Sequence, residues 1–253
     1  MKALSLQSGS NGNCYYVEAE GTRLLFDAGL SGRETKRRLA MHGLNVGDID
    51  ALIISHDHSD HARNAGVLHR MFDIPLFLSG PTLDTIRGKL GRLDGTEGFS
   101  VGDTLQFGPI SVETIPTPHD AVDGTTFVVC ANERRIGILT DLGHPFPELH
   151  DVIRGLDGVF IESNYDPEML ETGPYPEFLK SRIRGPAGHI SNVEAAQLLE
   201  ENASDRLEWV CLAHLSEKNN RPDLAIETHQ TVLPARFPLH VATRHEPSEV
   251  FEL

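Results

Sequence analysis

The chain has 253 residues and a formal net charge of −15, because 22 lysines and arginines face 37 aspartates and glutamates. One hydrophobic core can still organise this length, and no repeat, low-complexity stretch or linker divides it, so we expect a single domain over residues 1–253. The acidic balance argues against a nucleic-acid substrate, and the lack of a secretion signal or long apolar stretch predicts a cytoplasmic protein without a membrane span.

The first third of the sequence is expected to form short strands and then one helix. Gly, Ser and Asn turns separate three strand-like segments, which is typical of an antiparallel start; these are residues 3–7, 15–19 and 23–27. A helix is predicted over residues 34–41, ended by Gly43. The wholly apolar run 51–55 predicts a strand that is buried on both faces and delivers the loop 56–61 at its carboxyl end.

Helices and strands then alternate along the rest of the chain. Helices are predicted over residues 62–71, 81–90, 175–184, 192–201 and 222–233. Strands are predicted over residues 74–78, 104–107, 110–115, 125–131, 134–140, 157–162, 207–213 and 237–242. Because the strands gather in two middle stretches with helices around them, we expect an α/β fold, a four-layer αββα sandwich of two packed sheets with helices outside.

Six residues after the strand 51–55 hold three imidazoles and two carboxylates, in the order His56-Asp57-His58-Ser59-Asp60-His61. In an extended loop, side chains 56, 58 and 60 would share one face, and His61, expected to open a helix, would aim at the same point. Imidazole combined with carboxylate suits zinc or manganese. A simple polar turn rarely carries four ligand-type residues at these offsets, so the segment predicts a metal site.

Three more ligand-type residues follow predicted strands. They are His119, Asp141 and His214. A lone histidine of this kind is more often a hydrogen-bonded core residue than a ligand. Four strand-end placements along one chain reverse that expectation.

The segment HDHSDH resembles the HxHxDH signature of metallo-β-lactamase-fold hydrolases. The resemblance implies the fold of that family and two divalent metal ions, zinc or manganese. It also implies how the ions are held: His56, His58 and His119 on the first, Asp60, His61 and His214 on the second, and Asp141 bridging both. Oxygen-reducing di-iron relatives resemble HxExDH, so His58 indicates hydrolysis.

Two further segments are similar to the RNase Z branch of that family. Residues 160–165 (FIESNY) and 188–192 (GHISN) resemble its EA-x-Y and GHS elements. In that branch the histidine of GHS protonates the departing oxygen and the glutamate holds its ring, so Glu162 and His189 are implied to form a general-acid dyad. Each residue alone would be read as structural, Glu162 as a strand-end carboxylate and His189 as a helix-start residue.

Blocks along nearly the whole chain resemble the YycJ/WalJ/VicX group of exonucleases with this fold. They cover residues 8–15, 25–32, 162–170, 188–192 and 213–220. Members of the group act as 5′-to-3′ exonucleases on double-stranded DNA and are linked to repair. The resemblance therefore implies a phosphodiesterase whose substrate is DNA.

The implied ligand set predicts a mechanism. Two cations about 3.5–4 Å apart would share a water, lower its pKa and present hydroxide to phosphorus. Asp60 would orient that hydroxide, and His189, steadied by Glu162, would give a proton to the leaving sugar oxygen. The loop 8–13 either offers backbone amides to phosphate oxygens or is a plain hairpin turn.

Two rival classes stay open at this stage. A small-molecule hydrolase acting on a cyclic phosphodiester, lactone or thioester is favoured by the acidic charge and opposed by the Glu162–His189 dyad. A non-catalytic binding protein would be favoured by a missing ligand, and none is missing. The oligomeric state is also open, with a homodimer among the alternatives.

The cysteines and the basic clusters receive structural interpretations. Cys14, Cys130 and Cys211 form no CxxC pair and are expected to be buried thiols in a reducing compartment. Two basic clusters are expected to be solvated helix faces; these are Arg33, Lys36, Arg37 and Arg38, and Lys180, Arg182 and Arg184.

Overall fold

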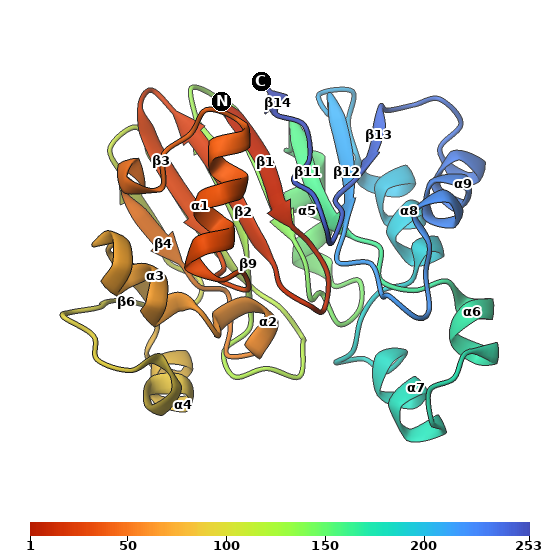
Figure 1. Ribbon diagram of the computed structural model, residues 1–253. Coiled ribbons are helices and arrows are strands. Elements are labelled where there is room, and N and C mark those ends of the chain that lie inside the picture. Colours follow the sequence, from red (N-terminus) through yellow and green to blue (C-terminus); the bar gives the residue numbers. More distant parts are fainter.

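The computed structural model describes residues 1–253 and contains two seven-stranded sheets packed face to face, with helices on both outer sides (Figure 1). The strand order is β14-β1-β2-β3-β4-β5-β6 in the first sheet and β13-β12-β11-β10-β9-β8-β7 in the second. The four-layer αββα arrangement expected from the sequence is confirmed. None of the helices has the length and apolar character needed to cross a bilayer.

The first sheet begins antiparallel and continues parallel. Its strands are β1 (Lys2–Gln7), β2 (Cys14–Ala19), β3 (Thr22–Phe26), β4 (Ala51–Ile53), β5 (Leu76–Ser79), β6 (Glu97–Phe99) and β14 (Phe251–Glu252). The β1–β2–β3 pairings are antiparallel, whereas β3, β4, β5 and β6 pair in parallel. The last strand, β14, pairs with β1, so both ends of the chain lie at one edge of this sheet (Figure 1).

The second sheet repeats this plan. Its strands are β7 (Thr104–Phe107), β8 (Ile110–Pro116), β9 (Thr125–Ala131), β10 (Arg134–Leu139), β11 (Gly158–Glu162), β12 (Trp209–Ala213) and β13 (Leu239–Val241). Strands β7 to β10 form an antiparallel meander, and β10 to β13 pair in parallel. The parallel strands of one sheet deliver their carboxyl ends to a common edge.

The helices flank the sheets and the site. They are α1 (Gly32–Met41), α2 (Ser59–Ala62), α3 (Ala65–Phe72), α4 (Gly80–Leu90), α5 (Pro147–Arg154), α6 (Pro167–Thr172), α7 (Glu177–Ile183), α8 (Asn192–Asn202) and α9 (Pro222–Val232), with a 3₁₀ turn η1 at Val46–Asp48. One core lies between the sheets, and two more lie under the outer helices. The inner core is rich in aromatic rings, with Phe26 and Phe127 5.1 Å apart between centroids.

Two expectations about the helices were wrong. The segment 62–71 is not one helix, because α2 ends at Ala62 and α3 begins at Ala65. Asp60 lies inside α2 rather than in an extended loop, and His58 is the residue that precedes this helix. Short polar residues such as Ser59 and Asp60 favour a helix start. The turn at this point separates Asp60 from the face that His56 and His58 share.

The cysteine and basic-cluster expectations were partly wrong. Cys14 and Cys211 are buried free thiols, but Cys130 is only half-buried. Arg38 is buried rather than solvated, because its guanidinium donates to the Leu6 carbonyl at 2.7 Å and to Glu34. Lys180 is also buried. Long basic side chains on a helix pack their stems against apolar surface, which the sequence pattern alone does not reveal.

We expect Gly158→Ala to destabilise the fold by overpacking. Gly158 opens β11 against Trp209, and an added Cβ would overlap the Trp209 ring in the core between the sheets. The free energy of unfolding should fall by about 1–3 kcal/mol in urea titrations. Gly98→Ala on β6 is the control, since an added Cβ there meets nothing within 4 Å. Equal losses in both variants would contradict the packing argument.

Candidate metal centre

The ligand-type residues follow the carboxyl ends of strands in both sheets. Asp141 comes two residues after β10, His214 directly after β12, and Glu162 is the last residue of β11. From the first sheet, β4 leads into the segment that begins at His56. Asp141 and His214 have left-handed backbone conformations, with φ of 57° and 53°. Such strain in non-glycine residues is typical of functional sites.

All seven residues expected to bind metal come together at this edge. Their ligand atoms lie within 4.8 Å of one another in overlapping groups. The groups are His56, His58 and His119; Asp60, His61 and His214; His56, His61 and Asp141; and Asp141 with Glu162, His189 and His214. Asp141 is therefore the carboxylate shared between the two halves of the cluster.

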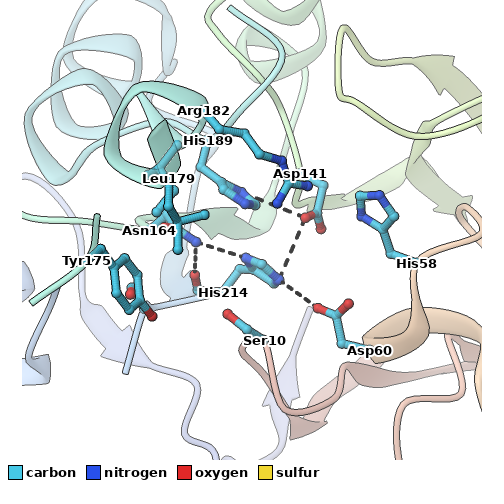
Figure 2. Close-up of a pocket in the computed structure, with 12 residues that line it drawn as sticks. Ser10, His58, Asp60, Asp141, Asn164, Tyr175, Leu179, Arg182, His189 and His214 are labelled. Carbon is cyan, nitrogen blue, oxygen red and sulfur yellow. Dashed lines mark hydrogen bonds and ion pairs between the residues drawn. The ribbon is translucent and has the colours of Figure 1, made fainter. Parts of the chain in front are cut away.

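The two carboxylate oxygens of Asp141 lie close to imidazole nitrogens from both groups of histidines. Its Oδ2 is 3.1 Å from His61 Nε2, and its Oδ1 is 3.5 Å from His119 Nε2 and 3.6 Å from His214 Nε2. Asp60 Oδ2 lies 3.4 Å from His61 Nε2. It lies at the same distance from His214 Nε2 (Figure 2). The carboxylates thus lie between imidazoles that all present the same ring nitrogen.

The cluster fits divalent metal ions on the evidence of its own hydrogen bonds. The protein occupies the Nδ1 side of four rings. His56 Nδ1 is 2.9 Å from Ser55 Oγ and His119 Nδ1 is 2.8 Å from the Gly188 carbonyl, while Asp27 and Asn164 hold His61 and His214 in the same way. His56 Nε2 and Asp141 Oδ2 are buried and have no hydrogen-bond partner. Unsatisfied buried polar atoms are costly, and a cation coordinated by their lone pairs removes that cost.

The third ring, His61, is held by a residue that sequence reasoning missed. Its Nδ1 lies 2.7 Å from Asp27 Oδ2, and Asp27 Oδ1 accepts from the amide and hydroxyl of Ser55 at 2.9 and 2.8 Å. Asp27 thereby orients His61 directly and His56 through Ser55. The signal was present, because Asp27 ends the apolar run of β3 just as Asp141 follows that of β10.

The charges of the cluster shift its ionisation. Burial would raise the pKa of Asp60, but the imidazoles of His61 and His214 hold it below its ordinary value. Burial lowers the pKa of His56, which keeps that imidazole neutral, the form that binds a metal ion. Burial would also lower the pKa of His61, but the carboxylates of Asp141 and Asp27 raise it above its ordinary value, so this ring must lose a proton before it binds a metal ion.

Glu162 and His189 form a second unit beside the cluster. His189 Nδ1 is 2.5 Å from Glu162 Oε1, and the Leu142 amide donates to Glu162 Oε2 at 2.8 Å. Glu162 is fully buried, whereas the His189 side chain is 19% exposed and lines the central pocket. Burial would lower the pKa of His189, but the Glu162 carboxylate raises it above its ordinary value. The pair can therefore present a protonated imidazole to the pocket.

The pocket that joins these units has a volume of about 200 Å³. Figure 2 shows residues from both sheets facing it. Its lining comprises Ser10, His58, Asp60, Asp141, Asn164, Tyr175, Leu179, Arg182, Ile183, His189, His214 and Ser216.

Arg182 of α7 binds Asp120 through two hydrogen bonds of 2.5 and 3.0 Å, and Asp120 Oδ1 is 3.6 Å from His119 Nε2. Arg182, expected on a solvated helix face, is thus part of the pocket wall.

Comparison with known proteins identifies the family. Residues 8–214 match the sequence model of the metallo-beta-lactamase superfamily. The chain belongs to this superfamily. It is 37% identical over 222 residues to exodeoxyribonuclease YycJ of Bacillus anthracis, covering 87% of this chain and 84% of the relative. It is 35% identical over 232 residues to exodeoxyribonuclease WalJ of Streptococcus pneumoniae, covering 90% and 85%.

The fold of this chain is similar to that of a solved structure. The metallo-beta-lactamase fold protein YhfI from Bacillus subtilis superposes with a TM-score of 0.77 and 17% identity, covering 100% of this chain and 99% of that one. With the family and its His/Asp cluster established, the protein is a metal-dependent hydrolase.

Two side chains of loop 8–13, those of Ser8 and Asn13, contact residues of the His/Asp cluster. Asn13 Nδ2 lies 2.9 Å from His61 Nε2 and 3.3 Å from Asp60 Oδ2, and Ser8 Oγ accepts from the His214 amide at 2.7 Å. Four of its six backbone amides already have protein acceptors; these are the amides of Ser8, Gly9, Gly12 and Asn13. Of the two alternatives for this loop, phosphate binding is therefore ruled out for these four amides, because Gly9 and Gly12 donate within the loop while Ser8 and Asn13 donate to the carbonyls of Thr243 and Asp60.

Proposed function

We propose that this hydrolase is a dinuclear phosphodiesterase, most specifically a 5′-to-3′ DNA exonuclease, working within one domain that spans residues 1–253. The observation that carries this proposal is the Glu162–His189 pair, which opens onto the same pocket as the His/Asp cluster. A proton donor beside a metal cluster suits cleavage of an ester whose leaving oxygen needs protonation. The two exodeoxyribonuclease relatives, aligned over most of their length, support DNA as the substrate.

The proposed ligands divide between two ions, zinc or manganese. His56, His58 and His119 would hold the first ion and Asp60, His61 and His214 the second, with Asp141 as a ligand available to both. When bound, the ions supply Lewis-acid activation of water and neutralise charge on the phosphate.

The protein's own groups then orient water and move the proton. Asp60, whose side chain is 17% exposed at the pocket, accepts a hydrogen bond from the attacking water. Because Glu162 holds His189 at Nδ1, the His189 Nε2–H is the proton that goes to the leaving sugar oxygen. Glu162 keeps the ring in this tautomer and stabilises its charged form.

The decisive assay follows nucleotide release from 5′-labelled duplex DNA with Mn²⁺. We expect the wild type to release labelled mononucleotides at once, and Asp60→Ala to be slower by about 10²-fold or more. Glu148→Ala on α5 is a matched carboxylate control outside the pocket. If the wild type leaves DNA intact but hydrolyses a cyclic nucleotide phosphodiester, the substrate is a small molecule and the DNA proposal is wrong.

A further inference from the structure

Arg244 and Arg63 both donate hydrogen bonds to Asn11 at the tip of loop 8–13, and neither forms an ion pair with a carboxylate. Arg244 Nη1 donates to Asn11 Oδ1 at 3.0 Å, and its Nη2 donates to the Leu215 carbonyl. Arg63 Nε donates to the Gly29 carbonyl at 2.8 Å, and its Nη2 donates to the Asn11 carbonyl. All four acceptors are neutral amide oxygens, so neither guanidinium forms an ion pair with a carboxylate.

This arrangement differs from that of most arginines in the chain. Carboxylate partners raise the pKa of Arg37, Arg134 and Arg182, through Glu34, Glu208 and Asp120 respectively. Burial instead lowers the pKa of Arg244, which has no carboxylate within ion-pair distance. In a chain with a net charge of −15, a half-buried guanidinium without a counter-charge is an unusual feature. It costs free energy unless something else supplies the negative charge.

The loop backbone is shaped to hold Arg244 in this position. Gly9 has a φ of 128°, and a Cβ at that position would lie 2.9 Å from Arg244 Cζ. Any other residue would therefore push the guanidinium away. Ser10, the next residue, lines the pocket beside Asp60 and His214 (Figure 2). Arg244 lines a neighbouring pocket that shares Ser216 with the central pocket, and Arg63 binds the Asn11 carbonyl of the same loop. The two arginines therefore flank the loop whose Ser10 lines the central pocket.

The loop tip has unused donors suited to an anion. Each guanidinium carries five N–H groups and spends two on the loop and its neighbours, which leaves three on Arg63 and three on Arg244. The backbone amides of Ser10 and Asn11 also lack protein acceptors. Guanidinium forks and free amides on a turn are the groups that bind phosphate oxygens in proteins.

We propose that Arg244 and Arg63, with the tip of loop 8–13, bind a second phosphate group of the nucleic-acid strand, next to the phosphate at the His/Asp cluster. This inference rests on the proposed nuclease function and names the subsite that distinguishes a polynucleotide from a substrate with one phosphate. It also explains how an acidic protein binds a polyanion, because attraction is confined to a few fixed groups that flank this loop.

The test compares Arg244→Gln with the wild type as metal-loaded enzymes. For duplex DNA we expect the KM to rise by about 10-fold or more, and the slope of log(kcat/KM) against log salt to become shallower by about 0.9. For bis(p-nitrophenyl) phosphate, which has a single phosphate, the KM should change by a much smaller factor. Arg244→Lys keeps the charge without the fork, so its salt slope should stay close to that of the wild type.

A matched control removes one positive charge elsewhere. Arg154 is 60% exposed and lies at the end of α5, before β11 begins, whereas the pocket lies after the carboxyl end of β11. Arg154→Gln should leave both KM values and the salt slope unchanged.

The outcomes separate the inference from the function on which it rests. If Arg244→Gln raises the KM of both substrates equally, the arginine only braces the loop and the inference is wrong. If the wild type degrades DNA and Arg244→Gln keeps its KM and salt slope, the inference alone fails. If the wild type hydrolyses bis(p-nitrophenyl) phosphate but not DNA, the proposed function fails first and the second-phosphate subsite with it.

Discussion

Asp141→Ala is expected to lower DNA hydrolysis by about 10³-fold or more, which corresponds to about 4 kcal/mol of transition-state stabilisation. Asp141 is buried, and its two oxygens face His61, His119 and His214. Because Asp141 is the proposed ligand of both ions, its removal would leave the two halves of the cluster without a common ligand. Metal analysis of the purified variant should therefore show substoichiometric zinc or manganese, in parallel with the loss of turnover.

Three comparisons make the Asp141 result specific. Asp141→Asn keeps the shape of the side chain but not its charge, so it should lose metal as well while retaining the wild-type circular dichroism. Asp27→Asn removes no proposed ligand but weakens the support of His61, and through Ser55 that of His56, and should cost about 10–100-fold in metal affinity. Asp151→Ala, on the exposed face of α5, should change neither property. Stoichiometric metal in Asp141→Ala would contradict the shared-ligand assignment.

The sequence places its candidate ligands just after predicted strands, and the structure brings these residues together. Asp141 and His214 follow strands of the parallel half of the second sheet. His119 follows β8, which runs in the same direction as β10 because β9 lies antiparallel between them, so the carboxyl ends of all three strands lie at one edge. Asp27 follows the same rule but was missed, because it binds no metal in the motif and only orients His61. Supporting residues are recognised by partners distant in sequence, and a single sequence does not reveal those contacts.

The elements that escaped prediction are those fixed by tertiary context. α5 begins at Pro147 and has only eight residues, a length at which helix formation depends on packing, here that of Leu149 and Ile153 in the core under the second sheet. β6 and β14 have three and two residues and exist only as edge pairings. The roles of Arg63 and Arg244 were equally hidden, since they depend on a loop more than fifty residues from either side chain in sequence.

The Glu162–His189 dyad gives a test that depends on the leaving group. With DNA, His189→Ala should lower kcat by about 10²–10⁴-fold, the usual contribution of a general acid. With thymidine 5′-(p-nitrophenyl phosphate), the leaving p-nitrophenolate needs no proton, and the loss should be much smaller. A merely structural His189 would reduce both rates alike. Its ring is partly exposed and stacks 5.2 Å from the His214 ring, so metal content must be measured in the same samples.

The pH profile of DNA hydrolysis should report the same proton. Because Glu162 raises the pKa of His189, the acid is available below that raised pKa and is lost as the pH rises through it. In Glu162→Gln the carboxylate is gone while burial remains, so the pKa of His189 falls and the alkaline limb of kcat should move to lower pH. His189 faces the pocket, and Glu162 contacts the opposite side of its ring, at Nδ1. The shift would therefore show that Glu162 sets the pKa of His189 without touching the substrate. An alkaline limb that stays in place in Glu162→Gln would remove the dyad from the mechanism.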